Sequence, residues 1–210
     1  DMPTAGPPTT PEGKPKSKAQ RNFTDPDSRI MVHDGSFVQA FNAQAAVDSK
    51  TQIIVAQGVS NNVADLQHFQ PMAQRVLQVL RGRRPDVLVA DAGYWTAGNE
   101  SIADAPDIDV FIAVERMRRT PDREPSRKPP PARGSPKDLM KQKTETTRGK
   151  ALLITRRTTA EPPFGHIKEA RGFRRFSMRG LQKVRAEWAL VTACHNLMKL
   201  FRHHWAPVPA

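Results

Sequence analysis

Cysteine is nearly absent from the sequence, and this scarcity limits the chemistry open to the chain. Its 210 residues include one cysteine, Cys194, so an internal disulfide is impossible and we expect a reducing compartment, the cytoplasm. The six histidines form no spaced pair, so no zinc site is predicted. Long apolar runs are missing too, since none approaches the roughly 20 residues of a membrane-spanning helix. We therefore expect no membrane partner.

Acidic residues are outnumbered by basic ones. The chain has 33 lysines and arginines against 21 acidic residues, which gives a net charge of +12. Such a surplus predicts a polyanionic partner, most simply nucleic acid. The alternative is a solvated basic surface that binds nothing in particular.

Proline is abundant and unevenly placed, which predicts where the chain does not pack. The nineteen prolines cluster before Asn22, between Pro121 and Pro136, and at the C-terminus. We interpret residues 1–22 as a disordered, basic, proline-rich tail. Residues 116–150 lack an apolar face and are predicted to be a basic, flexible insertion. Apart from this insertion, residues 23–205 are expected to form one domain.

The remaining segments alternate between strand-like and helix-like patterns. Two strands joined by a polar link are followed by a helix, a strand, a short helix, a strand and a final helical region. The expected ranges are 37–47, 52–59, 63–80, 86–90, 99–103, 110–114 and 161–203. Pro71 predicts a kink or a late start of the first helix, and Gly82 its end. This order indicates an α/β fold.

Asp91 is the first candidate functional residue. It follows the apolar run 86–90, which is typical of a strand covered on both faces. Ligands bind at the carboxyl ends of such strands, and Gly93 lets the chain turn away and leave the carboxylate at the rim. The alternative is an ordinary turn or capping residue, since Asp is common after strands.

Glu161 is the second candidate, placed by the sequence at the start of the last helical region, with Pro162 and Pro163 in its first turn. An acidic residue there could simply complement the helix dipole. However, Arg157 precedes it by four residues and Lys168 follows it by seven, on one face of a helix. Glu161 could then hold a cation while both basic groups meet DNA phosphates.

Two carboxylates that share divalent metal ions suit phosphodiester chemistry. The metals activate the attacking oxygen and stabilise the leaving oxygen of an in-line displacement. Mg²⁺ prefers such oxygen ligands. Asp91 and Glu161 are therefore the candidate catalytic and metal-binding residues, with Mg²⁺ (or Mn²⁺) as the cofactor.

Several motifs together resemble the C-terminal part of the catalytic domain of bacterial insertion-sequence DDE transposases. The matching stretches are NFTDPDSR at 22–29, FNAQAAVD at 41–48, VADAGYW at 89–95, EPPFGHIKEARGFRR at 161–175, GLQKVR at 180–185 and NLMKL at 196–200. The resemblance covers roughly residues 22–202 apart from the basic insertion.

The resemblance implies a ribonuclease-H-like mixed sheet flanked by helices, and DNA cleavage with strand transfer as the activity. Asp91 would be the second Asp of the catalytic triad and Glu161 its Glu. Arg157, Glu161 and Lys168 match the family pattern Tyr-x2-Arg-x3-Glu-x6-Lys, in which Ile154 replaces the Tyr. DNA is the implied partner, with a homodimer on the transposon ends as a further option.

The sequence departs from the family where the first Asp belongs. The family places it on the first strand of the sheet, ahead of the hairpin, but the segment 30–32 is too short and too close to Pro26 for a central strand. We therefore expect a truncated domain over 23–205 that lacks its first strand and is inactive as a transposase. The alternative is a non-catalytic basic remnant that binds DNA through its phosphates. A small nuclease of the same fold would need the absent Asp as well.

Overall fold

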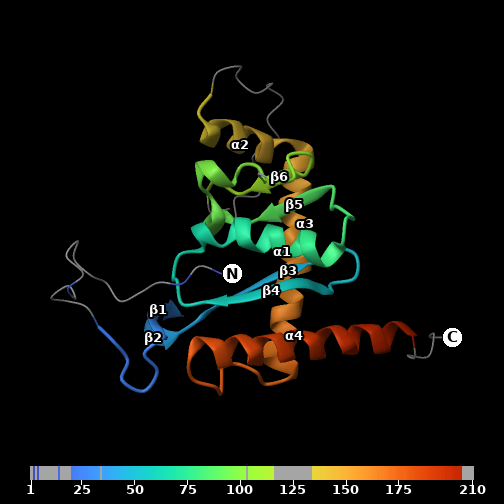
Figure 1. Cartoon of the computed structure of the whole chain (residues 1–210). Coiled ribbons are helices and arrows are strands. Elements are labelled where there is room, and N and C mark those ends of the chain that lie inside the picture. Colours follow the sequence, from blue (N-terminus) through green and yellow to red (C-terminus); the bar gives the residue numbers. More distant parts are fainter. Residues whose placement is uncertain are drawn as a thin grey trace.

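The computed structural model describes residues 2, 4, 14, 20–33, 35–102, 104–115 and 134–204, which form a mixed α/β fold (Figure 1). The strands are β1 (Arg29–His33), β2 (Ser36–Ala40), β3 (Asn42–Val47), β4 (Ile54–Ser60), β5 (Val87–Ala90) and β6 (Asp109–Ile112). The α-helices are α1 (Phe69–Leu80), α2 (Pro136–Glu145), α3 (Thr147–Gly165) and α4 (Leu181–His204). Short 3-10 turns are η1 (Asp65–Gln67), η2 (Ala92–Tyr94) and η3 (Ala97–Asn99), and η4 (His166–Ala170) is π-helical.

The described strands form three separate pairs. β1 pairs with β2 and β3 with β4, both antiparallel, whereas β5 and β6 are parallel. The strand expected over 37–47 is divided at Phe41 between β2 and β3, and residues 30–32 belong to β1, the partner of β2. The α/β class is confirmed, while one continuous ribonuclease-H-like sheet stays a prediction.

The elements stack in layers between α2 at one end and α4 at the other (Figure 1). α1 lies between the β3–β4 pair and the β5–β6 pair: it contacts β4 on one side, and its Phe69 and Ala73 join the apolar cluster of β5 and β6 on the other. α4 covers the opposite side of β4. α3 runs along the stack and contacts α2, β6, β5 and β3. One helix thus connects the layers.

α1 begins later than its apolar periodicity indicates. Pro71 lies in its first turn, where a missing amide donor costs little. Of the two predicted effects of Pro71, a kink or a late start, the structure shows the late start. Met72 and Val76 are buried as expected, but Leu66 lies before the helix and is 42% exposed. The helix ends at Leu80 and is capped by Arg81, whose φ of 46° is left-handed, and Gly82 follows with a φ of 87°.

Three apolar clusters hold the layers together, and the third joins α1 to β4 through Met2, Ala56, Met72 and Val76. The first joins α1, β5, β6 and α2 through Phe69, Ala73, Ala90, Ile102, Ala105, Ile108, Val110, Ile112 and Met140. The second joins β4, η4 and α4 through Ile54, Val59, Ile167, Val184 and Trp188. The stripe predicted on α4 packs at Val184, Trp188 and His195, but Met198 and Phe201 near the helix end are 40% and 55% exposed. None of the helices in the described ranges is long and apolar enough to cross a membrane.

The structure differs from expectation in the segment 134–150. Residues 136–145 form α2, which begins with Ser135 as its cap (Oγ accepts from the Asp138 N–H at 3.2 Å) and Pro136 in its first turn. Met140 is 4% exposed and anchors α2 to β6. Residues 116–133 of the predicted insertion lie outside the described residues, as does most of the predicted tail, although Met2 packs against Gly58. The predicted domain bounds stay predictions.

The outer edge of β4 is covered by side chains rather than by another described strand. Arg75 of α1 donates to the Gln57 carbonyl at 2.7 Å, and Arg185 of α4 donates to the Val59 carbonyl at 3.1 Å. Asn196 of α4 bonds both to the N–H and to the carbonyl of Ile54, each at 2.9 Å. These contacts satisfy backbone groups that would otherwise lack a partner strand.

Candidate active site

Asp91 lies at the carboxyl end of β5, where the chain leaves the parallel strand pair. Its Oδ1 accepts a hydrogen bond from the Gly93 N–H at 3.0 Å, and its carbonyl accepts one from the Tyr94 N–H at 3.2 Å. These two bonds close the turn η2, with Asp91 as its N-cap. The Asp91 side chain is 46% exposed, so the carboxylate remains accessible while its backbone is fixed.

A second carboxylate, Asp65 of η1, approaches Asp91 across Gly93. A Cβ placed on Gly93 would lie 3.0 Å from Asp65 Oδ2 and 3.2 Å from Asp91 Oδ1. The two carboxylate oxygens can therefore be no further apart than the sum of these distances. Sequence reasoning missed Asp65, because it lies in a short turn with no motif of its own.

Side-chain amides of β3 hold Asp65 from the other side. Its Oδ1 accepts from Asn42 Nδ2 at 2.7 Å and from Gln44 Nε2 at 2.9 Å. Gln44 is 4% exposed, and its Oε1 accepts a hydrogen bond from the Tyr94 hydroxyl. Burial, together with the nearby Asp65 and Asp91 carboxylates, raises the pKa of Tyr94, so the phenol keeps its proton and acts as a donor.

Arg156 of α3 faces Asp91, and sequence reasoning missed it as well. Its Nη1 lies 3.6 Å from Asp91 Oδ2, and its side chain is 25% exposed. Arg156 and Arg157 are consecutive residues of a helix, so their side chains point about 100° apart. One of them therefore faces the strands and the other faces solvent. The sequence could not say which. The ion pair brings α3 beside the Asp91 turn.

Glu161 lies further along α3 on an exposed surface. Its side chain is 65% exposed, and Oε1 lies 3.6 Å from Arg157 Nε, four residues earlier in the same helix. Arg157 is 47% exposed. The two predicted residues are therefore neighbours, held together by a pair whose stabilising effect in solvent is small.

The expected start of the last helical region at Glu161 is wrong. α3 begins at Thr147, and Pro162 and Pro163 lie inside it rather than in a first turn. Proline lacks an amide hydrogen, so Pro162 leaves the Thr158 carbonyl without its usual helical partner. That carbonyl accepts a hydrogen bond from Gln52 Nε2 at 3.3 Å, which compensates the lost bond.

Lys168 is exposed and lies in η4, after the end of α3. The change from α- to π-helix alters the rotation per residue, so the seven-residue spacing from Glu161 no longer places both residues on one uniform helix face. Ile167 beside it is 2% exposed and packs in the second apolar cluster. Packing of Ile167 thus fixes the turn that carries Lys168.

The fit of this region to a divalent metal is partial. Asp91 and Asp65 offer carboxylate oxygens, the donors that Mg²⁺ prefers. Across the described ranges, however, no three His, Cys, Asp or Glu side chains come together closely enough to hold a metal. The donor chemistry fits Mg²⁺ or Mn²⁺, but Glu161 is not grouped with the two aspartates.

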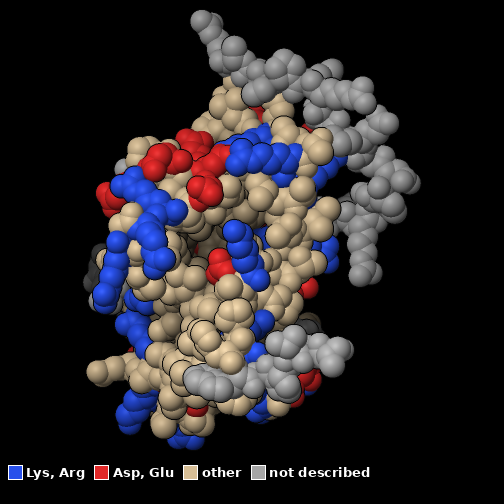
Figure 2. Space-filling model, turned by 90° about the vertical axis from the view of Figure 1, so that its right-hand side faces the viewer, with Lys and Arg blue, Asp and Glu red and all other residues tan. Residues whose placement is uncertain are grey.

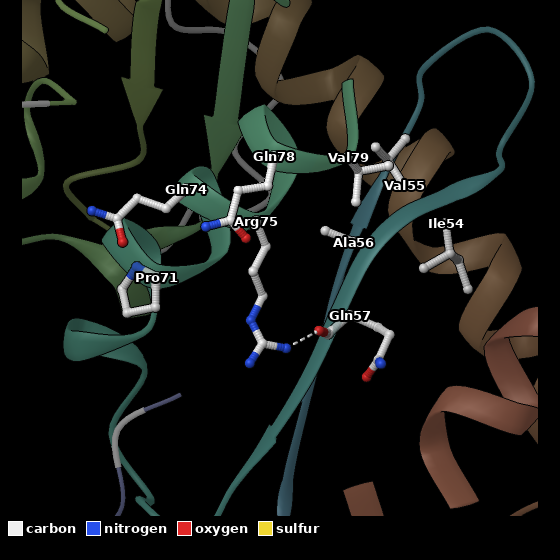
Figure 3. A pocket seen from close by; sticks show the side chains of 9 residues that line it. All are labelled: Ile54, Val55, Ala56, Gln57, Pro71, Gln74, Arg75, Gln78 and Val79. Carbon is white, nitrogen blue, oxygen red and sulfur yellow. Dashed lines mark hydrogen bonds between the residues drawn. The ribbon is translucent and has the colours of Figure 1, made fainter. Parts of the chain in front are cut away.

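A separate pocket of about 510 Å³ lies between β4 and α1. Figure 3 shows Arg75 extending from α1 to the Gln57 carbonyl across this pocket. Its lining includes neither aspartate of the turn region nor any residue of α3. The pocket is therefore a feature of the β4 edge and not of the candidate active site.

Charged groups of both signs share the face seen in Figure 2. Lysines and arginines are spread over it, and acidic side chains gather in its upper part beside basic ones. No uniformly basic field covers this face. The electrostatic argument for DNA therefore depends on the net charge of +12 of the whole chain.

Comparison with known families decides what kind of domain carries these residues. A family model described as a transposase DDE domain matches residues 9–197, which is most of the chain. The chain belongs to this family. Searches of curated proteins and of solved structures gave no match. The transposase match confirms the resemblance drawn from the 89–95 and 161–175 motifs, and both lie within the matched range.

Proposed function

We propose that Asp91 and Glu161 of this transposase DDE domain are the carboxylates that hold Mg²⁺ (or Mn²⁺) for DNA cleavage and strand transfer. The observation that supports this most directly is the Arg156–Asp91 ion pair of 3.6 Å. It joins the helix that carries Glu161 to the strand end that carries Asp91. When bound, the metal activates the attacking oxygen and stabilises the leaving oxygen.

The basic residues near Glu161 then bind the substrate. Arg157 is 47% exposed on α3, and Lys168 is exposed on η4. Each can contact a phosphate of DNA with its charged group while the carboxylate beside it binds metal. The nucleic-acid partner follows from the family and from the net charge of +12.

This chain alone is expected to bind divalent ions weakly and not to cleave DNA. The reason is that no group of three metal-binding side chains is formed within the described ranges. Incubation of the chain with inverted-repeat DNA and Mg²⁺ tests this. Specific strand cleavage would contradict the expectation.

Metal binding at the two carboxylates can be tested separately from cleavage. Free Mn²⁺ is measured by electron paramagnetic resonance during titration of the chain and of Asp91→Asn and Glu161→Gln. Asp107→Asn and Glu169→Gln are matched controls, since each removes one charge from an exposed acid paired with an arginine. Weaker Mn²⁺ binding in the first two variants alone supports the proposal. Equal binding in all four contradicts it.

A non-catalytic DNA-binding role is the second candidate function. It is favoured by the net charge of +12 and by the exposed Arg157 and Lys168, which can contact DNA phosphates whether or not a metal is bound. In that case DNA affinity falls steeply with salt and shows little sequence preference. Replacing either acid with Ala then leaves DNA binding unchanged or slightly tighter, which is measured by fluorescence anisotropy at several salt concentrations.

A further inference from the structure

The turn that presents Asp91 is attached to β3 through one buried glutamine. Gln44 lies at the centre of β3, opposite Gly58 of β4. Its backbone carbonyl accepts a hydrogen bond from Trp188 Nε1 of α4 at 3.1 Å, which fixes its main chain. Its side chain contacts Asp65 and Tyr94, one residue on each side of Asp91 along the chain.

The orientation of the Gln44 amide follows from its neighbours. Asp65 Oδ1 can only accept, so the group that meets it at 2.9 Å must be the NH₂ end. The same NH₂ donates to Asn42 Oδ1 at 2.7 Å. Oε1 therefore faces the Tyr94 hydroxyl and accepts its proton. Both ends of this amide have partners, and a flipped amide would place Oε1 against Asp65 Oδ1, a second acceptor.

Tyr94 transmits this anchor to the candidate active site. Its N–H bonds to the Asp91 carbonyl at 3.2 Å, and its ring packs edge-on against Phe69 with centroids 6.5 Å apart. Asn99 Nδ2 donates to the Tyr94 carbonyl at 2.7 Å and to the Leu66 carbonyl at 2.8 Å, which ties η2 to η1. The turn is thus held both through the Tyr94 hydroxyl and through the Tyr94 backbone.

Asp65 is placed by the same amide. With Oδ1 held by Asn42 and Gln44, Oδ2 is left facing Gly93 and Asp91 Oδ1. Two carboxylates this close repel each other, and the Arg156 guanidinium, 3.6 Å from Asp91 Oδ2, balances only one of the two negative charges. Holding the Asp65 carboxylate in place therefore increases the attraction of the Asp91 turn for a divalent cation.

We propose that Gln44 is a positioning residue of the transposase site: by holding the Tyr94 hydroxyl and the Asp65 carboxylate together, it sets the affinity of Asp91 for a divalent cation. This inference rests on the proposed function of Asp91. Partners that orient metal ligands typically change metal affinity by about 10- to 100-fold when they are removed. The Gln44 amide is expected to act at the lower end of this range.

The test is an Mn²⁺ titration of the whole chain, followed by electron paramagnetic resonance. Gln44→Met keeps the length of the side chain but removes both amide functions, and Tyr94→Phe removes a single oxygen. Each is expected to weaken Mn²⁺ binding about tenfold. Because both break the same hydrogen bond, the double variant is expected to lose less than the product of the two single losses.

Asn196→Leu is the control for a loss of stability alone. Asn196 makes two side-chain bonds to Ile54 near the start of β4, so its replacement removes amide contacts to the same hairpin without touching the Asp91 turn. Urea denaturation of each variant shows how much stability is lost. Mn²⁺ binding that stays intact in Asn196→Leu but weakens in Gln44→Met and Tyr94→Phe supports the inference.

Other outcomes separate this inference from the proposed function. If Asp91→Asn binds Mn²⁺ like the parent chain, both are overturned. If Asp91→Asn loses binding but Gln44→Met and Tyr94→Phe do not, only the positioning role is overturned. It is also overturned if Mn²⁺ affinity follows urea stability equally in all variants, including Asn196→Leu. If Gln44→Met does not fold, Tyr94→Phe decides, since it removes one atom.

Discussion

The two candidate carboxylates are presented in different ways. Asp91 caps a 3-10 turn at a strand end, and a buried amide network that involves Gln44 and Asp65 lies behind that turn. Glu161 lies on an exposed stretch of α3, and its ion pair is with Arg157 of the same helix. One group is fixed by contacts from several segments of the chain, and the other by its helix.

For the proposed metal site, this difference predicts that the two carboxylates would contribute in different ways. A ligand held in a turn has its orientation set before the ion arrives, whereas an exposed helical side chain can change rotamer to complete the coordination. The position of α3 then decides where Glu161 can reach. The predictions below perturb the helix first, then the turn, and finally the two arginines that accompany them.

The largest effect is expected where α3 meets α2. A Cβ on Gly149 would lie 2.3 Å from the Lys143 carbonyl oxygen, a backbone atom that cannot move aside cheaply. Gly149→Ala is therefore expected to lower the free energy of unfolding by about 2 to 3 kcal/mol. Gly165→Ala is the control near the other end of α3, since its Cβ meets nothing within 4 Å. Urea denaturation that shows equal stability for both variants would contradict this packing.

The next effect concerns the turn. Gly93→Ala places a Cβ at 3.0 and 3.2 Å from the Asp65 and Asp91 carboxylates, which must then separate by a few tenths of an ångström. We expect a loss of about 1 kcal/mol, measured by thermal and urea unfolding. Mn²⁺ binding is also expected to weaken in Gly93→Ala. It should stay unchanged in Gly165→Ala, four residues after Glu161. Unchanged Mn²⁺ affinity in Gly93→Ala would show that the turn tolerates displacement.

A pH effect should distinguish the buried turn from the exposed helix. Burial and the two aspartates raise the pKa of Tyr94 in the folded chain, whereas in the unfolded chain it is about 10. The stabilisation from the protonated phenol is therefore complete below pH 10 or so, and is lost as the pH rises from there towards the folded pKa.

The measurement uses the fact that Tyr94 is the single tyrosine of the chain. Tyrosinate absorbance should appear at higher pH in the folded protein than in urea. Urea midpoints of the parent chain should fall more steeply than those of Tyr94→Phe as the pH is raised above about 10. Coincident absorbance curves in the folded and unfolded states would overturn this assignment.

The smallest effects on stability are expected at the arginines. Arg157→Met breaks an exposed pair and should change stability by about 0.5 kcal/mol or less. Arg156→Met also costs little stability, but it removes a cation that lies 3.6 Å from Asp91 and competes with metal there. Mn²⁺ binding should therefore tighten in both variants, and more in Arg156→Met, because the Arg157–Glu161 pair is more exposed and better screened. The opposite order would place the metal closer to Glu161 than to Asp91.

The sequence predicted the strand end at Asp91 because local signals agree there. An apolar run of strand length, an aspartate and a glycine turn follow one another within a few residues, and each feature acts locally. The α1 face was predictable for the same reason, since Met72 and Val76 follow the helical period. The α/β class followed from the order of such segments.

The supporting contacts could not be predicted, because they join distant segments. Gln44, Asp65 and Tyr94 meet only once β3, η1 and η2 have packed together, and no spacing rule connects them. α3 was missed for another reason: Pro162 and Pro163 indicate a helix start, yet Gln52 satisfies the carbonyl that Pro162 leaves free. A signal for α2 was present in Ser135 followed by a proline, a typical helix start.

The covered edge of β4 has a consequence for how molecules of this protein meet one another. An uncovered strand edge can recruit a strand from a neighbouring molecule and begin aggregation. Here the guanidinium groups of Arg75 and Arg185 and the amide of Asn196 already occupy four backbone groups along that edge. Two of the three carry positive charge, so a second molecule approaching in the same way meets both blocked hydrogen bonds and like-charge repulsion. This side of the hairpin is therefore a poor template for edge-to-edge pairing with a second molecule.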